Sequence, residues 1–533
     1  MSKRFADLAI ATLLLGWSGA VDADVAVPSM FSDHAVLQRG IAVPVWGTAG
    51  PGEAVTVEFG GQTKATTADG NGRWMVYLDP MQADSSSGDL VITGNNVILV
   101  SDVQVGDVYL GSGQSNMQRP LSDDCDAAAA IADAPSYNMR FFNVTASGGN
   151  VASTVWEVSD TNSAPAMSAV HFYFGRHLAQ HLPDVPIGLI TSAVGATAIE
   201  RWATCAGSGK LYTGQIVPLQ PYALRGVTWY QGEWDARGSQ DSSKYYWQLP
   251  CLIEEWRADW GQGAFPFYVV QMPKMGISSI HIVRDAELQT TLNDPQVEMI
   301  VTIDQPGSDV HPPCKDPFGI RLATLARKLE YGQDVVARSP LYNAGACYVD
   351  GNTIGVVFDH VADGLQSSGG ELAEWEVAGA NGNYVAATAS IVGTDTVEVW
   401  SASIPIPVSA RYAFSTNPAD NNLVNSAGLP ASPIREVAPD PTPSLCGDGF
   451  CDPGEDPCTC ADDCGPPPLA EAICDDGVDN DCDLDADCFD IDCELDPVCA
   501  VPPTDCSQYT DKRSCNGVFE CRWDNRNKVC LER

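Results

Sequence analysis

The chain is poor in basic side chains. Lysine and arginine together account for 29 of its 533 residues, against 69 aspartates and glutamates, so its formal charge is −40. A protein with this imbalance repels the phosphates of nucleic acids and the headgroups of anionic membranes, so we expect neither as a partner. Part of the negative charge is local, because aspartate is concentrated after Cys446.

Long apolar runs are also scarce. The candidate is residues 8–15, which follow Lys3 and Arg4 and precede small residues at 21–23. This is the pattern of an export signal, and the run is too short to span a bilayer stably. We therefore expect a signal peptide over residues 1–23, no transmembrane segment after its cleavage, and a secreted, periplasmic or cell-surface protein. A retained membrane anchor is the alternative.

Cysteine is sparse in most of the chain and dense at its end. Of the 19 cysteines, 14 lie between Cys446 and Cys530. In an exported protein, a dense, even-numbered block predicts disulfide bonds, which replace the core that such short modules cannot build. The odd number in the body leaves at least one thiol unpaired, unless it bonds to the tail or to another chain. The body cysteines are Cys125, Cys205, Cys251, Cys314 and Cys347.

The apolar pattern divides the chain into several domains. Short alternating strands broken by turn residues predict β-sandwich domains over 24–102 and 340–437. Between them, over 103–339, continuous apolar strands alternate with helical patterns, which predicts a doubly wound α/β domain with a parallel sheet. A proline-rich linker at 438–445 leads into acidic, cysteine-rich modules at 446–533.

The acidic tail has one candidate metal site. Carboxylate oxygens at high density suit calcium, although the full EF-hand pattern is absent and a solvated acidic loop is the alternative. We also expect the tail to contact a surface or another protein. The candidate ligands are Asp479, Asp481, Asp483 and Asp485.

One serine stands in a turn that suits nucleophilic chemistry. An apolar strand over 108–111 leads into small residues, which deliver Ser115 where a helix can begin. Unpaired N–H groups and the positive end of a helix dipole meet there, and these stabilise an oxyanion. A serine in a glycine-rich turn is more often a helix cap or a loop residue, so this signal needs support from elsewhere in the chain.

Histidine is rare, and His311 alone among the seven has a suitable context. It lies in a loop rich in glycine and proline, after a strand that ends at Asp304 and before a helical stretch. Asp309 is two positions earlier. A histidine near its usual pKa accepts a serine proton and returns it to a leaving alcohol, while a carboxylate holds the ring tautomer. Three other histidines are expected on a solvated helix face: His171, His177 and His181.

Three sequence boxes, one of which contains Ser115, support this chemistry in combination. They are Gly113-Gln114-Ser115-Asn116-Met117, the stretch from Gly195 to Trp202, and Trp229-Tyr230-Gln231-Gly232-Glu233. Together with His311 they resemble the sialate O-acetylesterase family of SGNH hydrolases, and the likeness spans residues 25–437. The resemblance implies a three-layer α/β/α sandwich that removes acetyl esters from carbohydrates. It also implies that Ser115 is the nucleophile, His311 the base and Gly195 a backbone donor to the oxyanion.

The chain departs from the family pattern at the oxyanion donor. Where the family has Ser-Asn after the Gln-Gly-Glu box, this chain has Trp234-Asp235. An ionised aspartate cannot donate a hydrogen bond, so either Asp235 is protonated or Gln231 or Asn116 serves instead.

The position of the acidic residue of the triad also departs from the family pattern. The superfamily places its acid three residues before the histidine, where this chain has Ser308. We therefore predict Asp309 as the acid, with Asp304 in reserve. Four residues of the boxes are expected to contact the sugar, with a structural role as the alternative for the glutamate: Gln114, Glu233, Asp235 and Trp202.

These observations predict a secreted carbohydrate O-acetylesterase, similar to sialate 9-O-acetylesterases, with a Ser-His-Asp acetyl-enzyme mechanism. Its partner is an acetylated carbohydrate substrate, and the mechanism needs no metal or other cofactor. Two alternatives remain. One is a non-catalytic carbohydrate-binding or adhesive surface protein, which the Asp235 substitution and the tail keep open. The other is a broad-specificity esterase that prefers longer acyl chains.

Overall fold

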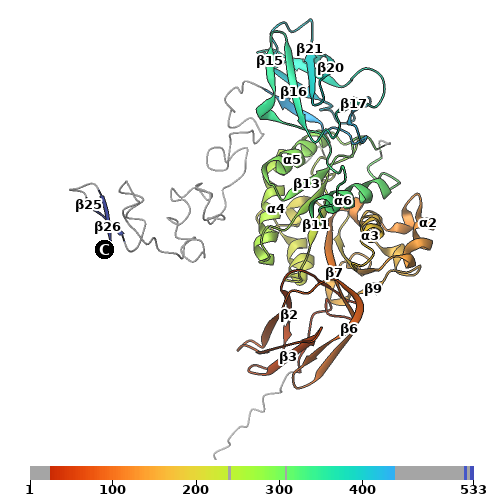
Figure 1. The fold of residues 1–533 in the computed structure, drawn as a ribbon, viewed down its shortest axis with the longest axis vertical. Helices are drawn as coiled ribbons and strands as arrows, with labels where there is room; N and C mark the ends of the chain where they lie inside the picture. Colours follow the sequence, from red (N-terminus) through yellow and green to blue (C-terminus); the bar gives the residue numbers. More distant parts are fainter. Residues whose placement is uncertain (1–23, 238–241, 306–308, 439–520, 525–528, 533) are drawn as a thin grey trace, which may run out of the picture.

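The computed structural model describes residues 24–237, 242–305, 309–438, 521–524 and 529–532 (Figure 1). Within the last two ranges, β25 (Cys521–Asp524) and β26 (Val529–Glu532) form an antiparallel pair. The predicted signal peptide, residues 439–445 of the predicted linker and most of the cysteine-rich modules lie outside these residues. So do the candidate calcium ligands Asp479, Asp481, Asp483 and Asp485, and these predictions stay predictions.

A large mixed sheet holds the centre of the molecule. Six of its strands run parallel to their neighbours, and a short strand closes one edge antiparallel. The order is β13 (Val297–Ile300), β12 (Phe267–Val270), β11 (Gly226–Tyr230), β7 (Val97–Gly113), β10 (Ile187–Ala193), β8 (Met139–Asn143) and β9 (Glu157–Val158). Every residue of β8, β10, β11 and β12 is buried, as the continuous apolar runs predict. The α/β class is confirmed.

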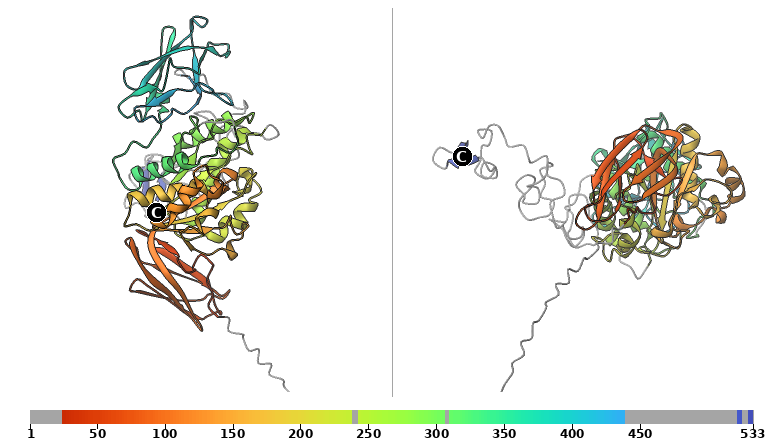
Figure 2. Two further views of the ribbon diagram at one scale, coloured as in Figure 1. Left: turned by 90° about the vertical axis from the view of Figure 1, so that its right-hand side faces the viewer. Right: turned by 90° about the horizontal axis from the view of Figure 1, so that it is seen from below.

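Helices pack in pairs beside this sheet (Figures 1 and 2). Helix α3 (Ala169–His181) contacts α6 (Asp316–Leu329), and α4 (Tyr245–Trp260) contacts α5 (Ile280–Asn293). The shorter helices are α1 (Ser115–Gln118) and α2 (Ala127–Asp133).

The expectation of a solvated position is wrong for His171. It is fully buried on α3, and its Nδ1 lies 2.9 Å from Thr191 Oγ1 on β10. Strand β10 and helix α6 cover α3 from two sides, which leaves no solvated face at this position. Burial lowers the pKa of the His171 ring to about 3.

The amino-terminal region is a set of β-strands that continues into the central sheet. Strands β3 (Ala54–Phe59), β4 (Gln62–Thr67) and β6 (Asp84–Thr93) pair antiparallel, β2 (Val43–Thr48) pairs with β5 (Arg73–Leu78), and β1 (Val36–Gln38) runs parallel to β7.

Strand β7 is 17 residues long and belongs to both regions. Its first part pairs with β6, and its last part pairs with β10 and β11. The predicted domain border between residues 102 and 103 therefore falls inside one continuous strand.

The region that follows the α/β part is entirely antiparallel. Its strands are β14 (Leu341–Tyr342), β15 (Tyr348–Asp350), β16 (Thr353–Asp359), β17 (Leu365–Ser367), β18 (Trp375–Ala378), β19 (Val385–Ala386), β20 (Thr388–Val392), β21 (Thr396–Trp400), β22 (Ser409–Tyr412), β23 (Leu423–Asn425) and β24 (Ile434–Val437). They form sheets in the orders β14-β16-β21-β20, β19-β18-β22-β24 and β17-β23, with β15 beside β16.

Two disulfides cross-link the α/β region. Cys125 bonds to Cys314 and Cys205 to Cys251, while Cys347 is a free thiol, in agreement with the odd number of body cysteines. In the described ranges, no helix combines the length and the apolar character needed to cross a bilayer.

Candidate active site

The ends of three neighbouring strands bring the predicted residues together. Tyr230 on β11 and Ala193 on β10 both lie opposite Gly113, the last residue of β7. Gly113 has φ +135°, and a Cβ there would lie 2.1 Å from the Tyr230 carbonyl oxygen, so only glycine fits. The turn after it places Ser115 at the first residue of α1.

Ser115 and His311 meet although they are 196 positions apart. His311 Nε2 lies 2.9 Å from Ser115 Oγ. The histidine sits in the connection between β13 and α6, at the same edge of the sheet as the serine turn. Both side chains line a pocket of about 620 Å³, together with Gln118, Arg119 and Thr145.

The environment of His311 favours the neutral form of its ring. Burial lowers the pKa of the imidazole below its usual 6.5, and the positive charges of Arg119 and Lys315 act in the same direction. The negative charge of Asp309 opposes them. A neutral ring with Nε2 at the serine hydroxyl is able to accept its proton.

The structure corrects the predicted orienting role of Asp309. Its Oδ1 accepts a hydrogen bond from the backbone N–H of His311 at 3.1 Å, because an aspartate two positions before an amide closes an Asx turn. In the described part of the chain, no side chain accepts a hydrogen bond from His311 Nδ1. The reserve candidate Asp304 is paired with Arg321 at 2.6 Å, and Ser308 lies outside the described residues.

Gly195 presents its backbone N–H beside the serine. A Cβ at Gly195 would lie 3.3 Å from Ser115 Cβ. The N–H donates to Gln118 Oε1 at 2.7 Å, so an amide oxygen occupies the donor. The first amide of α1, that of Ser115 itself, has no acceptor within its helix and is a second donor at this point.

The other two predicted oxyanion donors are engaged elsewhere, which corrects both predictions. Asn116 is fully buried, and its amide donates to Glu233 Oε1 and to the Val310 carbonyl oxygen. Gln231 is also fully buried, and its amide donates to the Thr197 carbonyl oxygen and to Asp235. A side-chain amide has two N–H bonds, so neither residue has one left for substrate.

The predicted sugar contacts of Gln114, Asp235 and Glu233 are corrected in the same way. Gln114 Oε1 accepts from Trp234 N at 3.2 Å, and Asp235 accepts from the backbone N–H of Ile199. All three side chains are buried. Burial raises the pKa of Asp235 to about 7, and its carboxyl group acts as an acceptor inside the protein rather than as a donor in the pocket.

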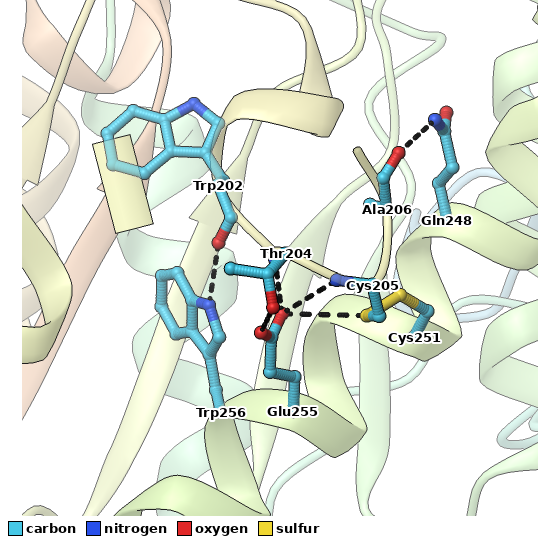
Figure 3. Close-up of a disulfide and its surroundings, with 8 residues drawn as sticks. All are labelled: Trp202, Thr204, Cys205, Ala206, Gln248, Cys251, Glu255 and Trp256. Atoms are coloured by element: carbon cyan, nitrogen blue, oxygen red, sulfur yellow. Dashed lines mark hydrogen bonds between the residues drawn. A yellow bond between two sulfur atoms is a disulfide. The ribbon is translucent and has the colours of Figure 1, made fainter. Parts of the chain in front are cut away.

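Trp202 is a core residue, and its predicted stacking on a sugar is corrected too. Its side chain is fully buried, and its Nε1 donates to Thr197 Oγ1 at 3.1 Å. Its carbonyl oxygen accepts from Trp256 Nε1 on α4 at 2.9 Å (Figure 3). The Cys205–Cys251 disulfide holds the same segment against α4.

Three residues of the site carried no sequence signal of their own. Gln118 and Arg119 follow the serine box directly and line the pocket. Lys315 is 2% exposed, and its Nζ donates to Asn116 Oδ1. Their closeness to Ser115 in sequence was an available signal for the first two. A lone lysine beside Cys314 offered none.

Comparison with known proteins agrees with this geometry. A family model described as "Carbohydrate esterase, sialic acid-specific acetylesterase" matches residues 105–324. The sialate O-acetylesterase of Pongo abelii is 30% identical over 373 residues, which cover 57% of this chain and 71% of the relative. The sialate O-acetylesterase of Mus musculus is 27% identical over 509 residues, which cover 76% of this chain and 93% of that relative. The crystal structure of a carbohydrate acetylesterase from Xanthomonas citri is similar with a TM-score of 0.71 and 34% identity, and the match covers 77% of this chain and 99% of that one.

Proposed function

Because the chain belongs to the sialate O-acetylesterase family, we propose that it hydrolyses acetyl esters of carbohydrates with Ser115 as nucleophile and His311 as general base. The observation that carries the proposal is the 2.9 Å separation of His311 Nε2 and Ser115 Oγ at the wall of a pocket. Membership of the family shows that the chain is an esterase. The pocket as the substrate site, and the roles of the residues in it, are what we propose. We also propose an SGNH-type α/β/α sandwich and export from the cell, which the paired helices and the disulfides support.

The reaction proceeds through an acetyl-enzyme. Ser115 Oγ attacks the acetyl carbonyl carbon while His311 Nε2 takes the hydroxyl proton. Collapse of the tetrahedral intermediate breaks the ester bond, and the proton returns from His311 to the departing sugar oxygen. A water molecule then attacks the acetyl carbonyl carbon and gives a proton to His311. The bond to Ser115 Oγ breaks, the serine oxygen takes that proton back from His311, and the acetic acid that leaves ionises to acetate. Asp309 supports the imidazolium through its charge and holds the His311 loop through the backbone.

The oxyanion binds where Gln118 now lies. The Gly195 N–H lies beside the serine side chain, and the side-chain oxygen Gln118 Oε1 occupies this donor in the free enzyme. The acetyl oxygen therefore replaces Gln118 Oε1 when substrate enters. The N–H of Ser115 completes the pair of donors that tetrahedral intermediates require.

Acetate release from a panel of acetylated glycans tests the function. The purified enzyme is compared with its Ser115→Ala variant on O-acetylated sialic acid, acetylated xylan and acetylated neutral monosaccharides. Release by the wild type alone supports the proposal and identifies the glycan. Glycan binding without acetate release would instead indicate an adhesive protein. Faster hydrolysis of butyryl esters than of acetyl esters would indicate an esterase of broad specificity.

Removing the Gln118 side chain is expected to increase activity. In Gln118→Ala the Gly195 N–H is free before substrate binds, so kcat/KM for 4-nitrophenyl acetate should rise about threefold to tenfold, the equivalent of one neutral hydrogen bond. Gln118→Glu should lower it at least about tenfold, since a carboxylate holds the N–H more strongly and repels the oxyanion. A loss of activity in Gln118→Ala would show that the amide assists catalysis and does not obstruct the donor.

The acidic limb of the pH profile is expected to have its midpoint below pH 6.5. The folded-state pKa of His311 is lowered, so the neutral, base-competent ring persists to lower pH than a free histidine would allow. Arg119→Gln removes a charge that lowers this pKa and should move the limb to higher pH, whereas Asp309→Asn should move it lower. The measurement is kcat/KM for an uncharged aryl acetate between pH 4 and pH 9. Shifts in the reverse directions would exclude His311 as the titrating base.

A further inference from the structure

A buried lysine lies behind the wall of the pocket. Lys315 is 2% exposed, and its Nζ donates to Asn116 Oδ1 at 2.5 Å. The rings of Tyr230 and Phe318 flank the ammonium group, with centroids at 5.7 and 5.4 Å. The side chain is thus enclosed by protein and does not reach the substrate space.

A buried glutamate binds the same asparagine from the other side. Glu233 is fully buried, and its Oε1 accepts a hydrogen bond from Asn116 Nδ2. Opposite charges therefore meet across one amide. Burial raises the pKa of Glu233 to about 6 and lowers the pKa of Lys315 to about 7, and the charge of each partner offsets part of this shift in the other.

These two charges determine which way the Asn116 amide points. Its oxygen must face the ammonium group and its nitrogen the carboxylate, because the reverse orientation would oppose donor to donor and acceptor to acceptor. In the observed orientation, the second N–H of the amide donates to the Val310 carbonyl oxygen at 2.9 Å. All the hydrogen-bonding groups of the amide are then used.

Asn116 connects the two residues of the reacting pair. It follows Ser115 directly in α1, and its side-chain amide binds the carbonyl oxygen of Val310, the residue before His311. The orientation of one amide thus links the serine turn to the histidine loop. The loop is also held by main-chain hydrogen bonds at Pro313 and Lys315 and by the disulfide at Cys314.

We propose that Glu233 and Lys315 are positioning residues, which act through the Asn116 amide to hold His311 at hydrogen-bonding distance from Ser115. The proposal rests on the proposed function of that pair. It predicts a loss in the chemical step with little change in substrate binding, because neither side chain reaches the pocket. A misplacement of about 1 Å costs on the order of 100-fold in rate.

Kinetics of single and double variants test the proposal. Glu233→Ala and Lys315→Met are each expected to lower kcat for 4-nitrophenyl acetate about 10- to 100-fold, with KM within about twofold of the wild type. The double variant should lose no more than the worse single variant, since both act through one amide. Glu233→Gln keeps an acceptor for Asn116 and should restore kcat to within about fivefold.

A matched lysine on the same helix is the control. Lys328 Nζ donates to the Val335 carbonyl oxygen at the far end of α6, so Lys328→Met should leave kcat unchanged. Folding of each variant is checked by its thermal transition. Where Lys315→Met does not fold, Asn116→Ser removes the shared amide and must give the same loss in kcat.

Three results would overturn the proposal. The first is a folded Glu233→Ala or Asn116→Ser variant with wild-type kcat. The second is a double variant whose losses multiply, which would show that the two charges act separately. The third is a loss confined to KM. If the wild-type enzyme shows no turnover, or if its turnover does not depend on Ser115, the proposed function itself is contradicted.

Discussion

Replacing Ser115 by alanine is expected to lower kcat for 4-nitrophenyl acetate by a factor on the order of 10⁴ to 10⁶. The change removes the oxygen that forms the acetyl-enzyme, and it leaves His311 without the hydroxyl that lies 2.9 Å from its Nε2. The backbone donors at Gly195 and Ser115 remain, so a small residual rate over water is expected. Steady-state kinetics with purified protein at pH 7.5 provide the measurement.

A second serine in the pocket supplies the matched control. Ser122 lines the same pocket as Ser115. Ser122→Ala should keep kcat within about threefold, because no step of the mechanism uses its hydroxyl. Wild-type turnover in Ser115→Ala would contradict the acetyl-enzyme mechanism and would leave the adhesive alternative as the better explanation.

Removal of the Cys125–Cys314 disulfide is expected to affect stability and catalysis together. The bond closes a loop between residues 189 positions apart, and its loss should lower the free energy of unfolding by about 3–5 kcal/mol. Cys314 lies three residues after His311, and the Cys125 N–H donates to the Pro313 carbonyl oxygen at 3.0 Å. A double Cys125→Ala, Cys314→Ala variant should therefore also lose kcat, by about tenfold or more.

The second disulfide separates these two effects. Cys205–Cys251 joins the segment after the Gly195 box to α4, and neither cysteine belongs to the His311 loop. The double Cys205→Ala, Cys251→Ala variant should lose stability but keep kcat at a temperature where it is folded. Chemical denaturation measures the first effect and aryl acetate turnover the second. Equal loss of kcat in both variants would show that the Cys125–Cys314 bond has no special relation to His311.

The sequence was sufficient to predict the strands and helices that follow from the spacing of apolar residues. Continuous apolar runs predict parallel strands buried on both faces, and the strand ends that follow from them bring Ser115, Gly195 and His311 to one edge of the sheet. The odd number of body cysteines likewise anticipates the free thiol of Cys347.

The roles of polar side chains were not predictable in this way. Asn116 and Gln231 carry the N–H groups that an oxyanion needs, but only the three-dimensional structure shows that buried acceptors already use them. An aspartate two residues before a histidine looks like a triad acid in sequence, whereas local geometry directs Asp309 to the backbone. Trp202 is an aromatic residue near the site in sequence, but its ring packs on Trp229 in the core, and its carbonyl oxygen accepts a hydrogen bond from Trp256 on α4, more than 40 residues away.

The length of β7 bears on how this protein can be divided. Its final residues deliver the turn that carries Ser115, and its first residues belong to the amino-terminal sheet, with no loop between them to serve as a hinge. We therefore expect that the amino-terminal region cannot be removed without disturbing the α/β region. A truncation at residue 103 would leave β7, the middle strand of the α/β region, without the hydrogen-bonded partner of its first part. The position of Ser115, the proposed nucleophile, is thus set partly by strands that precede the α/β region.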